Sequence, residues 1–324
     1  MTTRARIVLS RRWPKRIEAL LEEDYEVWRN DKDQAMSAAA MRQALRRGDG
    51  FCPTVTDRMD AEVLRVPSPR TRILANFGVG FEHIDLDAAR RSGIVVTNTP
   101  DVLTDCTADL TMTLILAAAR GVVSGDRMLR AGDWAGWRPT HIPGVRVSGK
   151  TLGLVGFGRI GRAVARRAGS GFGMRVRVLD PRPPADEEAR DLGVEVCADL
   201  DDLLETSDFV SLHCPVTPKT ERMIGQPQFT RMRPGAILIN TARGALVDER
   251  ALAGALRSGR LAAAGLDVYA REPEVPAELR EIGRVVLLPH LGSATRETRE
   301  AMGMRVKENL DRFFAGEEPP DRVA

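Results

Sequence analysis

Short apolar runs alternate with amphipathic segments along most of this chain. Runs of this length are typical of buried strands, and apolar positions that recur every three or four residues are typical of helices. In the first hundred residues, strands are expected at 5–10, 50–55, 72–75 and 94–97, and helices at 14–23, 33–47 and 85–92, with a short helical piece ending at 64–66. This alternation predicts a parallel sheet covered by helices.

The rest of the chain repeats the pattern after a long helical stretch at 102–130 and a loop-like segment at 132–148. Further strands are expected at 152–155, 176–179, 194–197, 209–213, 236–240, 263–268 and 285–288, and further helices at 200–206, 249–258 and 295–315. The chain of 324 residues is too long for one ordinary core. Two α/β domains are therefore predicted.

The segment between Thr151 and Asp180 reads as strand, glycine-rich turn, helix and second strand. Gly156, Gly158 and Gly161 have the G-x-G-x-x-G spacing. The first glycine permits the tight turn, the second lets backbone N–H groups approach a pyrophosphate, and the third lets helix and strand pack closely. The helix N-terminus favours the phosphates, and Asp180 can accept hydrogen bonds from the adenosine ribose. A plain glycine turn is the alternative, but the complete unit favours a nicotinamide dinucleotide.

Composition excludes several other classes of protein. The hydrophobic share of 43%, the charged share of 29% and the net charge of +3 are those of an ordinary globular enzyme. Arginines are scattered and not clustered with aromatic residues, so no nucleic-acid partner is expected. No run reaches the roughly 18 apolar residues of a membrane span. The four cysteines form no C-x-x-C pair and suit a reducing compartment, which favours a cytoplasmic location. No metal site is expected.

Polar residues directly after the later strands are candidates for catalysis, because ligands of open parallel sheets bind outside the carboxyl ends of the strands. These candidates are His213, Thr241, Ala242, Arg243, Asp267, Glu272 and His290. Taken singly, an arginine is most often a surface charge, a glutamate before proline a helix start and a histidine a packed core residue. Their convergence at successive strand ends predicts one catalytic site.

Six segments of the chain form an ordered set of motifs. They are 76–85 (NFGVGFEHID), 97–100 (TNTP), 156–161 (GFGRIG), 240–244 (NTARG), 265–273 (GLDVYAREP) and 289–295 (PHLGSAT). In sequence and order they resemble the D-isomer-specific 2-hydroxyacid dehydrogenases, over essentially the whole chain. The resemblance implies an α/β fold of two doubly wound parallel-sheet domains. A Rossmann cofactor domain, 100–290, would be inserted into a flavodoxin-like substrate domain formed by 1–99 and 291–324.

The resemblance places the catalytic residues at Arg243, Glu272 and His290. The substrate would be a small 2-oxo or 2-hydroxy acid. An arginine can donate two N–H bonds to its carboxylate and carbonyl oxygens. His290 would donate a proton to the carbonyl oxygen while hydride arrives from nicotinamide C4. Glu272 would bond the other imidazole nitrogen and favour the protonated ring.

The resemblance also implies binding roles for residues in other motifs. Backbone N–H groups of Val79 and Gly80 would receive the substrate carboxylate, unless they form a plain glycine turn, and Ser293 would lie at the substrate. The residues expected at the cofactor are Thr104, Gly156, Gly158, Arg159, Ile160, Gly161, Asp180, His213, Cys214, Pro215, Thr217, Thr241, Ala242, Asp267, His290 and Gly292. Of these, His213 is equally compatible with a purely structural role.

Within the family, the chain looks most like glyoxylate/hydroxypyruvate reductases. The segments that carry this likeness are 137–139, 292–295 and the Pro319-Pro320 tail. Formate members carry glutamine where Glu272 stands, and phosphite members carry a lysine near Val79. A dehydrogenase of D-3-phosphoglycerate or D-lactate remains an alternative. A nucleotide-sensing corepressor of the same fold is a further alternative from another functional class.

The cofactor and the assembly follow from two local features. The carboxylate of Asp180 repels a 2′-phosphate, so NADH is favoured. Relatives that use NADPH often replace this acid and follow it with paired arginines, whereas only Arg182 follows here and is expected to face solvent, so NADPH is possible but not favoured. Trp137 matches a tryptophan that some glyoxylate reductases pass into the partner's site, and an ordinary anchor of a dimer loop is equally compatible with it. The resemblance implies a homodimer.

Overall fold

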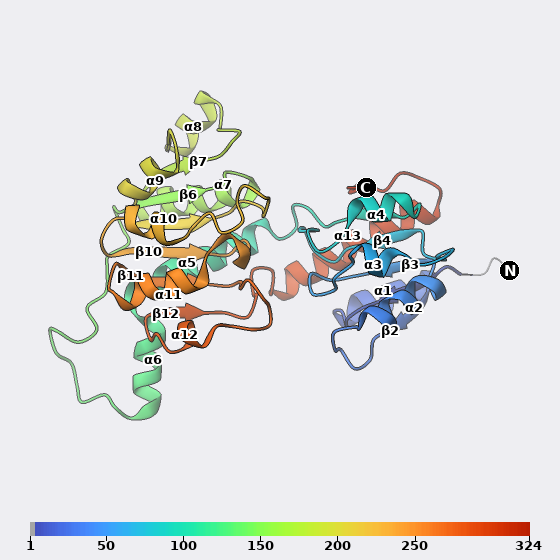
Figure 1. The fold of residues 1–324 in the computed structure, drawn as a ribbon, viewed down its shortest axis with the longest axis horizontal. Coiled ribbons are helices and arrows are strands. Elements are labelled where there is room, and N and C mark those ends of the chain that lie inside the picture. The colour runs from blue at the N-terminus through green and yellow to red at the C-terminus, as the bar shows by residue number, and fades with distance from the viewer. Residues whose placement is uncertain (1–3) are drawn as a thin grey trace. The chain divides into compact units, whose positions relative to one another are not determined.

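The computed structural model describes residues 4–324, which form two compact units (Figure 1). The terminal unit comprises Met1–Leu103 and Ala294–Ala324, and the central unit comprises Thr104–Ser293. Each has a parallel sheet of its own, so two doubly wound α/β domains, as predicted, are confirmed.

The terminal unit is built on a five-stranded sheet in the order β2-β1-β3-β4-β5. Its strands are β1 (Arg6–Leu9), β2 (Glu26–Arg29), β3 (Gly50–Cys52), β4 (Ile73–Ala75) and β5 (Val95–Thr97). All neighbouring pairs are parallel. This 2-1-3-4-5 order is that of the flavodoxin-like fold, in which ligands lie at the carboxyl ends of the strands.

Helices cover both faces of this sheet. They are α1 (Lys15–Asp24), α2 (Ala38–Arg47), α3 (Ala61–Leu64), α4 (Leu86–Arg91) and α13 (Arg296–Phe314). Apolar residues of α2, α3 and α4 form one core with Val8, Phe51 and Leu74 of the strands. The last residues of the chain bond to strand β5, where Val96 N–H donates to the carbonyl of Ala324. The C-terminal segment thereby covers the edge of the sheet.

The central unit is built on a seven-stranded parallel sheet in the order β12-β11-β10-β9-β6-β7-β8. Its strands are β6 (Thr151–Val155), β7 (Arg175–Leu179), β8 (Val194–Val196), β9 (Phe209–Leu212), β10 (Ala236–Asn240), β11 (Leu261–Leu266) and β12 (Val285–Leu287). Strand β6 lies between β7 and β9, so the strand order reverses there. Such a topological switch point is where Rossmann folds bind dinucleotides.

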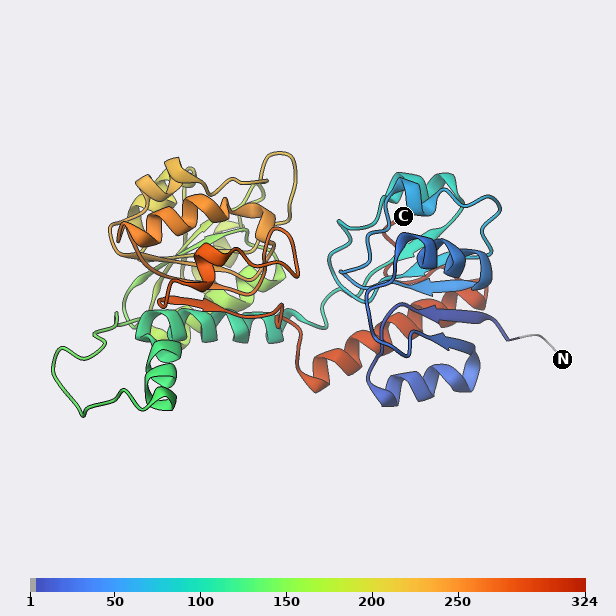
Figure 2. The same cartoon turned by 60° about the horizontal axis from the view of Figure 1, so that its bottom comes forward.

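Alternating side chains of these strands face two separate cores. Ile237 and Ile239 of β10 pack with α5 and α7, whereas Leu238 between them packs with α9, α10 and α11 on the other face. The helical segments are α5 (Thr104–Arg120), α6 (Val122–Ala131), α7 (Arg159–Arg166), a π-helix (Arg167–Gly171), α8 (Asp186–Leu192), α9 (Leu200–Thr206), α10 (Gln226–Arg231), a 3-10 turn (Gly244–Leu246), α11 (Glu249–Arg257) and α12 (Ala277–Arg280). Figure 2 shows α5 running along one side of the sheet.

Several elements differ from the sequence prediction for identifiable reasons. Helix α8 was not predicted because none of its residues is buried, which leaves no apolar period to detect. Strand β2 was missed because it is a half-exposed edge strand. The helices α10 and α12 were also missed, because with six and four residues they are too short to show a helical period. The helix predicted over 102–130 is two helices that meet at an angle of 63°, because Gly121 adopts a left-handed φ of 61°.

No single helix within residues 4–324 is long and apolar enough to cross a bilayer. The pair α5 and α6 passes that test only when the two bent helices are joined. Eight residues of α5 are buried against the sheet and its neighbouring helices, which makes it a core helix of the central unit.

Candidate active site

Three neighbouring strands of the central sheet end at polar side chains. Strand β10 leads to Arg243, β11 to Asp267 and β12 to His290. Because β10, β11 and β12 are adjacent and parallel, their carboxyl ends lie at the same edge of the sheet. The structure therefore groups the residues that the sequence placed after successive strands.

Glu272 and His290 form a direct pair at this edge. Glu272 Oε2 lies 2.7 Å from His290 Nδ1, and the two side chains are 28% and 32% exposed. The other carboxylate oxygen, Oε1, accepts a 3.0 Å hydrogen bond from the backbone N–H of Tyr269. This arrangement fixes the imidazole through Nδ1 and leaves Nε2 at the outer side of the ring, as a proton donor in catalysis requires.

The electrostatics of the pair favour an ionised glutamate. Burial opposes ionisation of Glu272, but the hydrogen bond and charge of His290, the N–H of Tyr269 and the charge of Arg243 together hold the pKa of Glu272 below its ordinary value. The stability that this interaction contributes to the fold is therefore fully present at pH values above the ordinary pKa of glutamate. It is lost only as the pH falls through the lowered pKa.

The backbone around His290 is held by Asp267. His290 has a left-handed φ of 56°, and its N–H donates to the carbonyl of Asp267 at 2.9 Å. The Asp267 carboxylate is 1% exposed and accepts bonds from the N–H groups of Leu291 (2.6 Å) and Gly292 (2.8 Å). Burial raises the pKa of Asp267 although these bonds oppose the rise. Asp267, expected at the nicotinamide side, is thus the support of the turn that presents His290.

Arg243 stands on a tightly packed turn after β10. Asn240 holds this turn, because its Nδ2 donates to the carbonyl of Arg243 at 2.8 Å and its Oδ1 accepts from the N–H of Ala242. A Cβ on Gly244 would overlap the backbone of Tyr269 and Ala270. The absent side chain therefore lets the Arg243 turn lie against the turn that carries Glu272. Thr241, whose Oγ1 lies 2.9 Å from Thr111 Oγ1, is buried against helix α5.

The glycine-rich turn has the shape that a dinucleotide requires. Gly156 has a φ of 98°, and a Cβ there would lie 2.6–2.7 Å from the backbone of His213 and Cys214. A Cβ on Gly161 would lie 2.5 Å from the carbonyl oxygen of Gly156, so both glycines are fixed by packing. Gly158 is exposed and faces open space. The residues thus fit a pyrophosphate at Gly158 and at the N-terminus of α7, which begins at Arg159 and Ile160.

Asp180 is anchored beside this turn. Its Oδ2 accepts a 2.7 Å bond from the N–H of Phe157, and its Oδ1 accepts a 2.8 Å bond from the N–H of Arg182. Each carboxylate oxygen has a second lone pair with which it can accept a bond from a ribose hydroxyl. The carboxylate is therefore held in place for the role predicted from the sequence.

The loop after β9 packs against the glycine-rich turn at Gly156. His213 Nε2 lies 2.9 Å from Ser211 Oγ, and desolvation lowers the pKa of His213 to about 4. The structure thus describes His213 as a neutral, packed ring. Its backbone lies against Gly156. Cys214 is partly buried, and Pro215 and Thr217 are exposed on the same loop.

The remaining predicted cofactor residues lie near the ends of the central unit. Thr104 is the first residue of α5. Gly292 is buried, and its carbonyl accepts a 2.9 Å bond from Oγ1 of Thr107, which lies in α5 like Thr104. Ser293, predicted at the substrate, is partly buried and is the last residue of the unit.

Val79 and Gly80 lie in the terminal unit, in the loop after β4. Side chains of Asn76 and Asn98 donate to the carbonyls of this loop, including a 2.9 Å bond to Gly80 and a 2.8 Å bond to Val79. Within residues 4–324 the backbone N–H groups of Val79 and Gly80 have no hydrogen-bond acceptor. Two such N–H groups in one loop can receive an anion.

Sequence reasoning missed two residues that shape the turns carrying Arg243 and Glu272. Gly244 stood inside the 240–244 motif without a role, and Glu249 looked like the acidic first residue of a helix. Only the packing of α11 against the 269–272 turn reveals their contacts.

Comparison with known proteins identifies the family of this chain. The family model described as D-isomer specific 2-hydroxyacid dehydrogenase, NAD binding domain, matches residues 112–292. A glyoxylate reductase from Thermococcus litoralis is 44% identical over 326 residues, covering 98% of this chain and 96% of the relative. Another from Korarchaeum cryptofilum is 46% identical over 323 residues, covering 98% and 95%.

A solved structure extends the likeness to three dimensions. The NADPH-dependent glyoxylate/hydroxypyruvate reductase from Sinorhizobium meliloti, in complex with NADP and malonate, has a TM-score of 0.88 and 34% identity. The alignment covers 99% of this chain and 97% of that chain. Fold and relatives together define an oxidoreductase with a nicotinamide dinucleotide cofactor and a small 2-oxo acid substrate. The chain belongs to the D-isomer-specific 2-hydroxyacid dehydrogenases, so the resemblance seen in the sequence is confirmed.

Proposed function

We propose that this enzyme reduces glyoxylate and hydroxypyruvate with NADH, and that Arg243, Glu272 and His290 are its catalytic residues. The observation that carries the assignment is the 2.7 Å pair of Glu272 and His290 beside the Arg243 turn. The relatives named glyoxylate reductase support the choice of substrate.

The chemistry follows from the three side chains. The bound cofactor supplies a hydride to the carbonyl carbon of the substrate. Arg243 forms paired N–H bonds with the carboxylate and carbonyl oxygens, which orients the substrate and polarises the carbonyl. His290 gives a proton from Nε2 to the carbonyl oxygen, and the Glu272 carboxylate stabilises the protonated ring through Nδ1. The N–H groups of Val79 and Gly80 bind the substrate carboxylate, and Ser293 lies at the substrate.

The cofactor-binding residues form three groups in this proposal. Gly156, Gly158, Arg159, Ile160 and Gly161 hold the pyrophosphate. The loop from His213 to Thr217 lies on the adenine side. The nicotinamide side is formed by Thr104, Thr241, Ala242, Asp267, His290 and Gly292, with Asp267 acting through the turn that it holds.

The anchored carboxylate of Asp180 makes NADH the preferred cofactor. A 2′-phosphate would approach a negative charge that is fixed by the N–H groups of Phe157 and Arg182. The Sinorhizobium relative is NADPH-dependent, so the choice requires direct comparison. We expect kcat/KM for NADH to exceed that for NADPH by about tenfold, which corresponds to about 1.4 kcal/mol.

The test is the loss of NADH or NADPH absorbance with glyoxylate, hydroxypyruvate, pyruvate and phosphohydroxypyruvate as separate substrates. Fast oxidation of NADH with the first two supports the proposal. A preference for NADPH would overturn the cofactor assignment and leave the reaction in place. If no 2-oxo acid is reduced with either cofactor, the proposed function is wrong.

We further propose a homodimer formed through the arm, defined as α6 and the loop at 132–148. Figure 1 shows the arm extending away from the rest of the central unit. None of the residues of α6 is buried, and the arm exposes Leu129 (60%), Trp134 (51%) and Trp137 (79%). Apolar surface of this kind is typical of a protein interface.

Sedimentation equilibrium is expected to give a dimer for the unmodified protein and a monomer for Leu129→Glu, because a charge would be buried in an apolar interface. Met304→Glu, at an exposed apolar position of α13, is the matched control and should remain dimeric. A monomeric unmodified protein at micromolar concentration would rule out the proposed assembly.

A cytoplasmic location is proposed from the cysteines, because all four thiols are free. Cell fractionation that recovers the protein outside the cytoplasm would contradict it.

A further inference from the structure

The turn that carries Glu272 is held by a carboxylate outside the predicted site. Glu249 is the first residue of α11, and its Oε1 accepts a 2.9 Å hydrogen bond from the backbone N–H of Ala270. The preceding N–H, of Tyr269, donates to Glu272 Oε1 at 3.0 Å. The consecutive N–H groups of Tyr269 and Ala270 thus donate to two different carboxylates, those of Glu272 and Glu249. One of these carboxylates is paired with His290.

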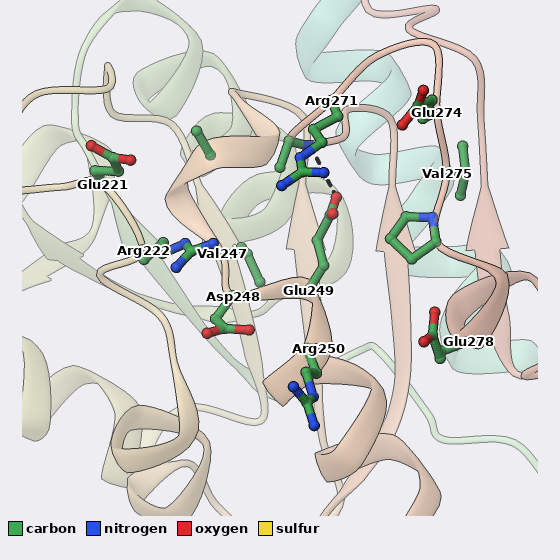
Figure 3. Close-up of a pocket in the computed structure, with 13 residues that line it drawn as sticks. Glu221, Arg222, Val247, Asp248, Glu249, Arg250, Arg271, Glu274, Val275 and Glu278 are labelled. Carbon is green, nitrogen blue, oxygen red and sulfur yellow. Dashed lines mark hydrogen bonds between the residues drawn. The ribbon is translucent and has the colours of Figure 1, made fainter.

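Glu249 lies in a pocket of about 520 Å³ beside this turn (Figure 3). Its side chain points from α11 toward the turn, and the dashed line in Figure 3 marks the bond that it makes. Burial raises the pKa of Glu249, and the negative charge of Glu272 contributes to the same shift. The two carboxylates are therefore close enough to influence each other electrostatically.

Other contacts hold the Tyr269 end of the turn that carries Glu272, whereas the N–H of Ala270 is held by Glu249. The Tyr269 hydroxyl donates to the carbonyl of Leu288 at 3.0 Å, which anchors the start of the turn. The backbone of Gly244 packs against the Tyr269–Ala270 peptide from the side of the Arg243 turn. Without an acceptor at Glu249, the N–H of Ala270 would lose its partner. A turn that moves to satisfy this N–H would also move Glu272.

We propose that Glu249 is a positioning residue that keeps the Glu272 carboxylate aligned with His290. This inference rests on the proposed function, in which His290 is the proton donor. It concerns a residue that touches neither substrate nor cofactor in that mechanism. Substrate binding depends on Arg243 and on the Val79–Gly80 loop, so loss of Glu249 should affect kcat more than KM.

Three substitutions separate the possible roles of Glu249. Glu249→Ala removes the acceptor, and kcat for glyoxylate reduction is expected to fall by about tenfold, with KM changed by less than about threefold. Glu249→Gln keeps an acceptor of the same length without the charge and should restore most of kcat. Glu249→Asp keeps the charge but is one methylene shorter, so it should behave like the alanine variant. Glu278→Gln, in the same pocket on α12, is the matched control and should leave kcat unchanged.

Amide hydrogen exchange supplies a readout that does not depend on activity. Exchange at Ala270 should be faster in the Ala and Asp variants than in the Gln variant and the unmodified protein. If Glu249→Asp is fully active and Glu249→Gln is not, charge and not position matters, and the inference is overturned. Equal kcat in all variants also overturns it.

The His290→Asn variant separates failure of this inference from failure of the proposed function. If that variant has lost turnover while the Glu249 variants have not, the proposed function stands without the positioning role. If His290→Asn retains turnover, the catalytic role that the proposed function gives to His290 is wrong, and the positioning role of Glu249 loses its premise. Should Glu249→Ala fail to fold, which thermal unfolding would reveal, the contrast between the Asp and Gln variants decides the question alone.

Discussion

Replacement of His290 by asparagine is expected to lower kcat for 2-oxo acid reduction by about 10³-fold, within the range that proton transfer by a positioned side chain contributes. Hydride addition to the carbonyl carbon places negative charge on the oxygen, and in the proposed mechanism His290 neutralises this charge by giving a proton. An asparagine amide is not an acid at neutral pH and is too short to reach where Nε2 stands. Water would have to supply the proton at a much lower rate.

Asparagine is the appropriate substitution because of the backbone. His290 has a φ of 56°, a left-handed conformation that asparagine adopts more readily than most residues. The turn held by Asp267 should therefore survive. Because the other proposed cofactor residues keep their positions, NADH binding should weaken far less than turnover. A variant with alanine would add backbone strain to the loss of the imidazole.

The measurement is steady-state oxidation of NADH together with NADH binding by protein fluorescence. His141→Asn makes the same chemical change in the arm, where His141 contacts Met128, and serves as the control. A loss of turnover that far exceeds any loss of NADH affinity, seen in the His290 variant alone, supports proton donation. Turnover close to that of the unmodified protein would contradict the assignment of His290.

The sequence was sufficient for the elements that are buried and periodic. Strand β11 is apolar throughout and β10 is apolar up to its last residue, Asn240, and the order of strands and helices predicted a parallel, doubly wound architecture. The polar helix α8 and the exposed edge strand β2 were not detectable, because nothing in their pattern distinguishes them from loops. The pattern of apolar and polar residues reveals an element only where its side chains are buried, and few side chains of α8 and β2 are buried.

The same limit explains what could be predicted of the candidate site. Arg243, Asp267 and His290 each stand within three residues of the end of a strand, so their position at one sheet edge could be inferred from chain order. The contact of Glu249 with Ala270 joins residues that are 21 apart in sequence. It depends on how α11 packs against the turn after β11, and no spacing rule encodes that. The sequence predicted Asp267 at the cofactor, and that stays a prediction. Its carboxylate bonds to the N–H groups of Leu291 and Gly292 could not be foreseen from the sequence.

Replacement of Gly244 by alanine is expected to have the second large effect, because the new methyl group would overlap the backbone of Tyr269 and Ala270. The two turns that carry Arg243 and Glu272 would have to separate, lowering the free energy of unfolding by about 1–3 kcal/mol and kcat of the folded enzyme by about 100-fold.

Gly254→Ala is the matched control. Gly254 lies within α11, and a methyl group there would meet nothing within 4 Å apart from the backbone of its own helix and its chain neighbours. Alanine should therefore raise the free energy of unfolding by about 0.5–1 kcal/mol through its better helix propensity. Urea unfolding and kcat measured well below the unfolding transition test both variants. The same substitution is thus expected to act with opposite sign at two glycines ten residues apart, because only Gly244 faces another backbone. Stability and kcat unchanged in Gly244→Ala would mean that the two turns do not pack as described, and the coupling of Arg243 to Glu272 would lose its structural basis.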